Sequence, residues 1–160
     1  MHHFRSVVAL VALLSGVVVL AGPAAAQKST YPDSMLKIVY EPRLISAQLQ
    51  AALVEAKKAV AGYDALGPDD PIEGPLQAIT NSYFLMRVAL AGMSGIRGQK
   101  KFPDPVMDLA FNKIKQAWDR ARGPIDSIHN SPARMNYIER SREASRDTVV
   151  LLEQGVAIWP

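Results

Sequence analysis

The stretch PRLISAQLQAALVEAKKAVAGYDALGP, residues 42–68, carries the clearest fold signal in the sequence. Its apolar residues recur at steps of three and four, which places them on one face of a helix: Ile45, Leu49, Ala52, Ala56, Ala59 and Tyr63. Pro42 suits the first helical position, because the N–H that proline lacks would have no partner there. The stretch therefore predicts an amphipathic helix that begins at Pro42 and ends before Gly67-Pro68.

A second helix is predicted from Pro75, which follows the turn at residues 69–74. Its apolar side repeats the same steps: Leu76, Ile79, Tyr83, Met86, Leu90 and Met93. Gly92, Gly95 and Gly98 weaken the end of this pattern, because glycine is a poor helix former. The basic segment from Arg97 to Lys101 is expected to be a loop.

A third helix should begin at Asp104-Pro105, where an acidic cap precedes a proline. Its predicted buried stripe contains Val106, Leu109, Ala110, Ile114, Ala117 and Ala121. Proline disfavours helix at the residue before it. The third helix is therefore expected either to kink or to stop at Gly123-Pro124.

Ser131-Pro132 repeats the start signal for a fourth helix, which should fade near Gly155. Its seam is polar in the middle: Met135, Ile138, Arg142, Ser145, Val149, Leu152 and Val156. An inward arginine needs a partner, for which Asp108, Glu55 or a bound acid could serve. The alternative, which is favoured, is that the stem of Arg142 carries its charge back to the surface.

Together these segments predict an all-α fold, an antiparallel up-down-up-down four-helix bundle over residues 42–160. Residues 27–41 are interpreted as a loose N-terminal arm. Sustained alternation with hairpin turns, the pattern of strands, does not occur in the sequence.

Residues 1–26 have the layout of a secretory signal peptide. His2, His3 and Arg5 precede an apolar run of about 14 residues, shorter than the ~20 that a spanning helix needs. Ala24-Ala25-Ala26 offers the small-residue cleavage pattern. We expect cleavage after Ala26 and a periplasmic or secreted protein with no transmembrane segment; an uncleaved membrane anchor is the alternative.

The composition narrows the function classes. The 160 residues are 49% hydrophobic and 21% charged and include no cysteine. Iron–sulfur centres, cysteine-based zinc sites and covalently attached haem are therefore excluded. Loss of Arg5 with the leader lowers the formal net charge from +3 to +2, which is too balanced to indicate binding of nucleic acid.

Two groups of residues could hold a ligand. Tyr83, Phe84, Phe111 and Trp118 could line an apolar pocket, although filling the core is the commoner role of such side chains. His129 with Met135 could ligate haem b between helices, a layout similar to that of periplasmic four-helix cytochromes, with which the chain shares no motif. A histidine at a helix end is the more ordinary interpretation of His129, and no cofactor is predicted.

Surface residues could instead contact a partner. The candidates are the basic residues Arg97, Lys100 and Lys101, the terminal Trp159, and the exposed face of the last helix. On that helix Glu139–Arg142 and Glu143–Arg146 are spaced for ion pairs along the surface.

The sequence therefore favours a non-enzymatic binding or interaction module that meets an envelope protein or a membrane surface. The alternative is a carrier of a small apolar ligand or of haem b. An enzyme is disfavoured, because one histidine and no nucleophile motif would remain after processing.

Overall fold

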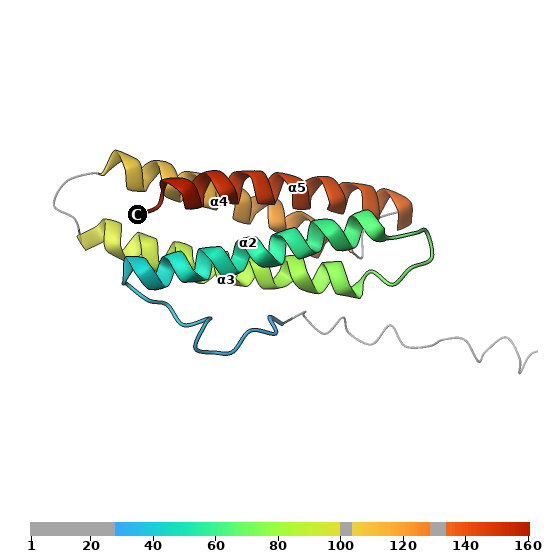
Figure 1. Cartoon of the computed structure of the whole chain (residues 1–160), viewed down its shortest axis with the longest axis horizontal. Coiled ribbons are helices and arrows are strands. Elements are labelled where there is room, and N and C mark those ends of the chain that lie inside the picture. The colour runs from blue at the N-terminus through green and yellow to red at the C-terminus, as the bar shows by residue number, and fades with distance from the viewer. Residues whose placement is uncertain (1–27, 100–103, 129–133) are drawn as a thin grey trace, which may run out of the picture.

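The computed structural model describes residues 28–99, 104–128 and 134–160, and within these ranges it contains four helices and no strand. The helices are α2 (Pro42–Ala65), α3 (Glu73–Gln99), α4 (Pro105–Ser127) and α5 (Arg134–Ile158). Each of α2 and α4 packs against both α3 and α5 (Figure 1). The all-helical architecture with four helices is confirmed, whereas the expected leader lies outside the described ranges.

The starts of the helices follow local chemistry. Helix α2 begins at Pro42, as predicted. Helix α4 begins at Pro105, and the Asp104 carboxylate accepts hydrogen bonds from the backbone N–H groups of Val106 and Met107 at 3.1 and 3.2 Å. Helix α3 begins at Glu73, two residues before the predicted Pro75. A proline is tolerated there because the first N–H groups of a helix have no helical partner.

Two glycines of α3 do not end the helix; they allow the N-terminal arm to pack closely against it. Helix α3 continues to Gln99, so the predicted loop at Arg97 is wrong at that residue. A side-chain carbon at Gly92 would collide with the Val39 carbonyl oxygen, and one at Gly95 would collide with the Tyr40 ring. Lys100 and Lys101 lie outside the described ranges.

Helix α4 runs through Gly123-Pro124 and ends at Ser127, so it does not stop at the proline. Its stripe is narrower than predicted, because Val106 and Leu109 are 55% and 50% exposed. Met135, at the start of α5, is also exposed. Apolar residues at steps of three and four cover a wide arc of the helix surface, and only part of that arc faces the core.

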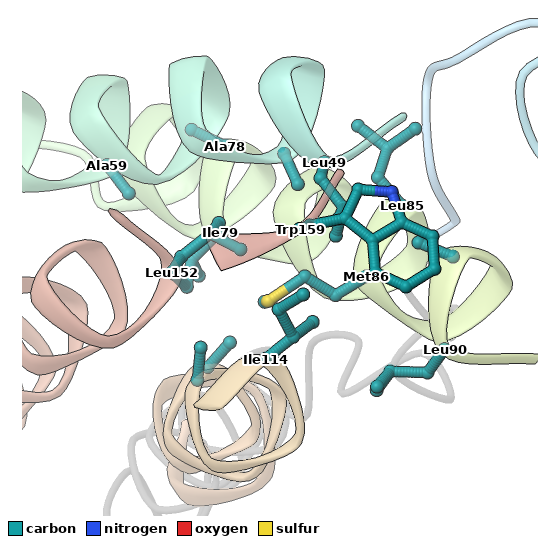
Figure 2. Close-up of a cluster of buried hydrophobic side chains, with 14 of the residues drawn as sticks. Leu49, Ala59, Ala78, Ile79, Leu85, Met86, Leu90, Ile114, Leu152 and Trp159 are labelled. Atoms are coloured by element: carbon teal, nitrogen blue, oxygen red, sulfur yellow. The ribbon is translucent and has the colours of Figure 1, made fainter. Parts of the chain in front are cut away.

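The core lies between the four helices, where Met86, Ile114, Leu152 and Trp159 converge (Figure 2). Trp159 is 6% exposed, and its indole N–H donates to the Pro42 carbonyl at 3.3 Å. The expectation of an exposed Trp159 is therefore wrong: the residue closes the core beside the start of α2.

The polar middle of α5 is buried at Ser141, Ser145 and Thr148. Arg142 leaves this seam and reaches α2, where it donates to the Tyr63 carbonyl at 2.8 Å and pairs with Asp64 at 3.1 Å. The side chain stays 28% exposed. Its partner is thus Asp64 and neither Asp108 nor Glu55. The favoured expectation of a charge carried to the surface is met only in part, because the guanidinium stays half-buried between α5 and α2.

Candidate functional site

Aromatic side chains meet where α3 faces α4. The rings of Tyr83 and Trp118 stack with centroids 5.2 Å apart and planes 18° from parallel. Phe84 meets the Tyr83 ring edge-on at 5.6 Å. Three of the four residues of the predicted aromatic pocket are therefore in contact, from two helices.

A surface groove of about 230 Å³ lies beside this stack, lined by Arg87, Leu90, Ala91, Ser94, Phe111, Lys115 and Trp118. Phe111 thus shares one groove wall with Trp118. All four predicted aromatics are partly buried. Only Phe111 and Trp118 line the open groove between α3 and α4; Tyr83 reaches it through its stack on Trp118, and Phe84 packs behind Tyr83. The four predicted aromatics therefore do not line one common pocket.

The charges around this groove are mostly engaged. The Arg97 guanidinium lies 4.3 Å above the Phe111 ring, and its Nε is 2.6 Å from Asp108 Oδ1. Lys115 pairs with Asp119 at 3.0 Å. Arg87 is exposed and forms no ion pair with the described residues. Arg97 therefore supports the groove wall, while Arg87 keeps an uncompensated charge.

The outer face of α5 borders two further grooves. The larger, about 660 Å³, lies toward α4 and is lined by Gln116, Asp119, Arg120, Asp147, Val150 and Leu151. The other, about 500 Å³, lies toward α2 and is lined by Lys57, Val60, Ala61, Asp64, Arg146, Val149 and Val150. Val150 lines both grooves and is 52% exposed.

Ion pairs between α2 and α5 flank the groove toward α2. Arg146 pairs with Asp64 at 2.8 Å, and Lys57 with Glu153 at 2.7 Å. Arg142 also reaches Asp64. Arg142 and Arg146 thus pair with Asp64 of α2, and not with Glu139 and Glu143 along their own helix as the spacing suggested.

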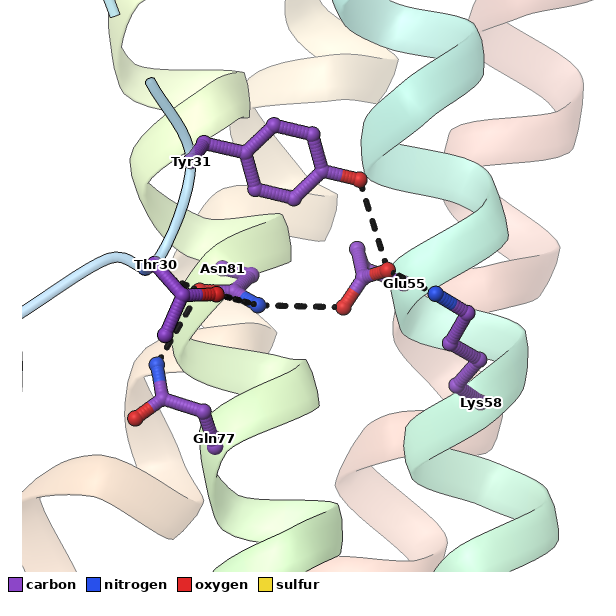
Figure 3. A network of polar contacts seen from close by, with 6 residues as sticks. All are labelled: Thr30, Tyr31, Glu55, Lys58, Gln77 and Asn81. Atoms are coloured by element: carbon purple, nitrogen blue, oxygen red, sulfur yellow. Dashed lines mark hydrogen bonds and ion pairs between the residues drawn. The ribbon is translucent and has the colours of Figure 1, made fainter. Parts of the chain in front are cut away.

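A buried carboxylate that the sequence patterns did not reveal fixes the arm (Figure 3). Glu55 is 4% exposed and accepts hydrogen bonds from Tyr31 Oη at 3.3 Å, Asn81 Nδ2 at 3.1 Å and Lys58 Nζ at 2.5 Å. The Asn81 amide oxygen in turn accepts from the Thr30 backbone N–H at 2.9 Å. We call Thr30, Tyr31, Glu55 and Asn81 the arm clamp.

Further along, the Gln48 amide donates to the carbonyls of Met35 and Lys37, both at 3.0 Å. The described part of the arm, residues 28–41, therefore lies along α2 and α3 and is not loose. A signal existed in the sequence, because Gln48 and Glu55 are polar residues adjoining an otherwise apolar helix face.

Burial changes the acidity of three tyrosines. It is the main reason that the pKa of Tyr63 lies far above its usual value, with neighbouring Tyr137 adding to the rise. Burial likewise raises the pKa of Tyr137, against the hydrogen bond from Tyr63. Burial and then the Glu55 charge raise the pKa of Tyr31. The Tyr63 and Tyr137 hydroxyls lie 3.3 Å apart.

The residues proposed for haem do not form an interior site in the described ranges. Met135 is 42% exposed at the start of α5, whereas a ligand to haem between helices must point inward. His129 lies outside those ranges. In the described part of the chain, histidine and acidic side chains form no group of three or more that could hold a metal ion.

Within the described residues, the length and apolarity needed to cross a membrane are not combined in any helix. Comparison with known proteins found no matching family model, curated protein or solved structure. The functional argument therefore depends on the geometry alone.

Proposed function

We propose that this protein is an exported, non-enzymatic interaction module whose docking surface is the outer face of α5. The observation that carries the proposal is that two open grooves meet at Val150. The arm already covers part of the α2–α3 side through the arm clamp. The α5 face has no such cover among the described residues, which leaves its apolar surface available to a partner.

The partner that fits this surface is the apolar side of an amphipathic helix from another envelope protein. Valines and an alanine form the floor of the α2–α5 groove, and charged side chains form its rim. A helix that lies in such a groove buries its apolar anchors on the floor and keeps its polar side in water. The rim charges are already paired within the protein, so recognition relies mainly on apolar contact.

Site-directed photocrosslinking tests this proposal. A photoreactive phenylalanine at position 150 should form a discrete crosslink in envelope extract, and excess wild-type protein should suppress it. The same probe at Glu139, an exposed position on α5 outside both grooves, is the matched control. Equal crosslinking at the two positions, or failure of the wild-type protein to compete, would refute the docking surface.

A second candidate function, a carrier of a small ligand, has its own supporting observation. The stacked Tyr83 and Trp118 and the groove beside them offer an aromatic surface. The haem b form of this candidate is tested by adding haemin to the purified protein. A sharp, stoichiometric Soret band that is lost in Met135→Ala or His129→Ala would support it, and an unchanged free-haemin spectrum would eliminate it.

Export and bundle topology belong to the same proposal. Cleavage after Ala26 predicts that protein recovered from the periplasm begins at Gln27, which N-terminal sequencing reads directly. The up-down-up-down order is supported by the neighbouring helix pairs and by Arg134, whose guanidinium donates to the Asp70 carbonyl and thus joins the start of α5 to the loop before α3.

A further inference from the structure

We propose that the groove between α3 and α4 binds a small amphipathic carboxylate, an acid with a short apolar chain or a single aromatic ring. The inference rests on the second candidate function and specifies its ligand class. It is independent of docking at Val150, which lies on α5.

The floor of the groove favours an apolar or aromatic body. Leu90, Phe111 and Trp118 supply large apolar surfaces, and Ala91 is a small residue among them. Tyr83 lies flat against Trp118 and Arg97 lies over Phe111, so both rings are held in place by contacts within the protein. Rings fixed in this way lose little freedom when a ligand packs on them.

The size of the groove limits the ligand. About 230 Å³ lies below the range of about 300–1,000 Å³ that is usual for drug-sized ligands. A haem or a two-chain lipid is therefore too large, whereas a benzoate-sized ring or a short acyl chain is of the right order.

The charge of the groove selects an anion. Of the three cations beside it, Arg97 and Lys115 are neutralised by Asp108 and Asp119. Arg87 has no ion pair within the described residues. A guanidinium binds a carboxylate through two parallel hydrogen bonds, so one free arginine matches a ligand with one carboxylate.

Nuclear magnetic resonance of the two tryptophan indole groups provides the test. Trp118 lines the groove, whereas Trp159 is buried and bonded to Pro42, which makes it an internal control. Octanoate and phenylacetate are added separately, up to about 10 mM so that weak binding is detected. Each acid should shift the Trp118 signal saturably and leave the Trp159 signal in place. Whichever acid binds more tightly shows whether the groove prefers an acyl chain or an aromatic ring. Octanol, which has no charge, should bind more weakly than octanoate.

Substitutions test the positive charge of the groove and its apolar floor separately. Arg87→Gln should weaken octanoate binding by about tenfold or more, since it removes a charge-assisted pair. Arg140→Gln changes an exposed arginine of α5 and is the matched control; it should leave binding nearly unchanged. Ala91→Leu should fill the groove and abolish binding without altering charge. Thermal unfolding of each variant confirms that it folds.

Three results would overturn the inference: no saturable Trp118 shift with either acid, octanol binding as tightly as octanoate, or equal weakening by Arg87→Gln and Arg140→Gln. None of these results affects crosslinking at position 150, so failure here is distinguishable from failure of the α5 docking surface. Conversely, a lost crosslink with an intact Trp118 titration would leave the carrier candidate standing alone.

Discussion

Glu55 shows how one buried side chain determines the position of a whole segment. A carboxylate taken out of water is tolerated only when hydrogen bonds replace its hydration. Two of the donors that Glu55 uses come from Tyr31 in the arm and Asn81 in α3. The arm clamp therefore stabilises the buried charge and the docked arm together, and neither is expected to persist without the other.

Replacing Glu55 with alanine should release the arm. The change leaves Asn81 without an acceptor for one of its N–H groups, at a cost of about 1–3 kcal/mol. Trypsin should then cleave after Lys37 several-fold faster, because cleavage follows the population of the open form. Mass spectrometry of timed digests measures the rate.

Lys58→Ala is the control for this experiment. It removes the exposed partner of Glu55 and leaves Tyr31 and Asn81 in place. Cleavage after Lys37 should change little in that variant. Equal rates in wild type and in Glu55→Ala would show that the arm does not depend on the carboxylate.

The Tyr63–Tyr137 pair predicts a loss of stability in alkali. Burial raises the pKa of Tyr63 above its usual value, while in the unfolded chain the phenol ionises near pH 10. Below that pH both states keep a neutral tyrosine. Above it only the unfolded state releases the proton, so the free energy of unfolding should fall by up to about 1.4 kcal/mol per pH unit for this residue.

Urea unfolding of wild type and Tyr63→Phe between about pH 9 and 11 isolates this effect, since lysine titration is common to both proteins. The wild type should lose stability relative to the variant as the pH rises above 10. Parallel curves for the two proteins would contradict the prediction.

At the scale of elements, the approach of α5 to α4 depends on a missing side chain. A carbon added at Gly155 would lie 2.5 Å from Ile114 Cγ1. Gly155→Ala should lower the free energy of unfolding by about 1–3 kcal/mol, because overpacking outweighs the gain of about 0.8–1.0 kcal/mol in helix propensity. Chemical denaturation measures the change.

Gly74→Ala makes the same substitution where the added carbon meets nothing within 4 Å. It lies in the first turn of α3, so stability should rise slightly. The two variants are thus expected to change stability in opposite directions. A Gly155→Ala protein as stable as Gly74→Ala would show that Ile114 moves aside freely.

The helices could be predicted from the sequence because their signals are local. The cap at Asp104, the proline at Pro42 and the repeated apolar steps all act within a few residues. The continuation of α3 past Gly92 could not be predicted in this way. It depends on the arm, which meets α3 from about fifty residues earlier in the chain.

At the scale of the whole molecule, the candidate groove could be predicted in part. The stacking of Tyr83 on Trp118 brings together residues that the sequence grouped by chemistry. Their place at the surface could not be inferred, because helical spacing does not tell which side of α4 faces α3. Trp159 is expected at the surface for another reason, because it follows the predicted end of the last helix near Gly155; in the structure it completes the core.

Trp159 joins the end of α5 to the start of α2 at one end of the bundle (Figure 1), so its removal should affect the entire fold. Trp159→Ala should lower the free energy of unfolding by about 3–5 kcal/mol, the usual cost of emptying a buried tryptophan site. Val150→Ala, at an exposed site, is the control and should change stability by less than about 0.5 kcal/mol. Near-identical unfolding midpoints for the two variants would contradict a core position for Trp159.

The contact between the Trp159 indole and Pro42 also has a consequence for folding during synthesis. Helix α2 is among the first parts of the bundle to leave the ribosome, yet the side chain that seals its starting end is translated 117 positions later. A chain that has been translated only to a point before residue 159 would expose apolar core surface at this end of the bundle, and exposed surface of this kind is prone to aggregate and is bound by chaperones. Until Trp159 has been made and packed, the start of α2 therefore lacks the ring that covers it.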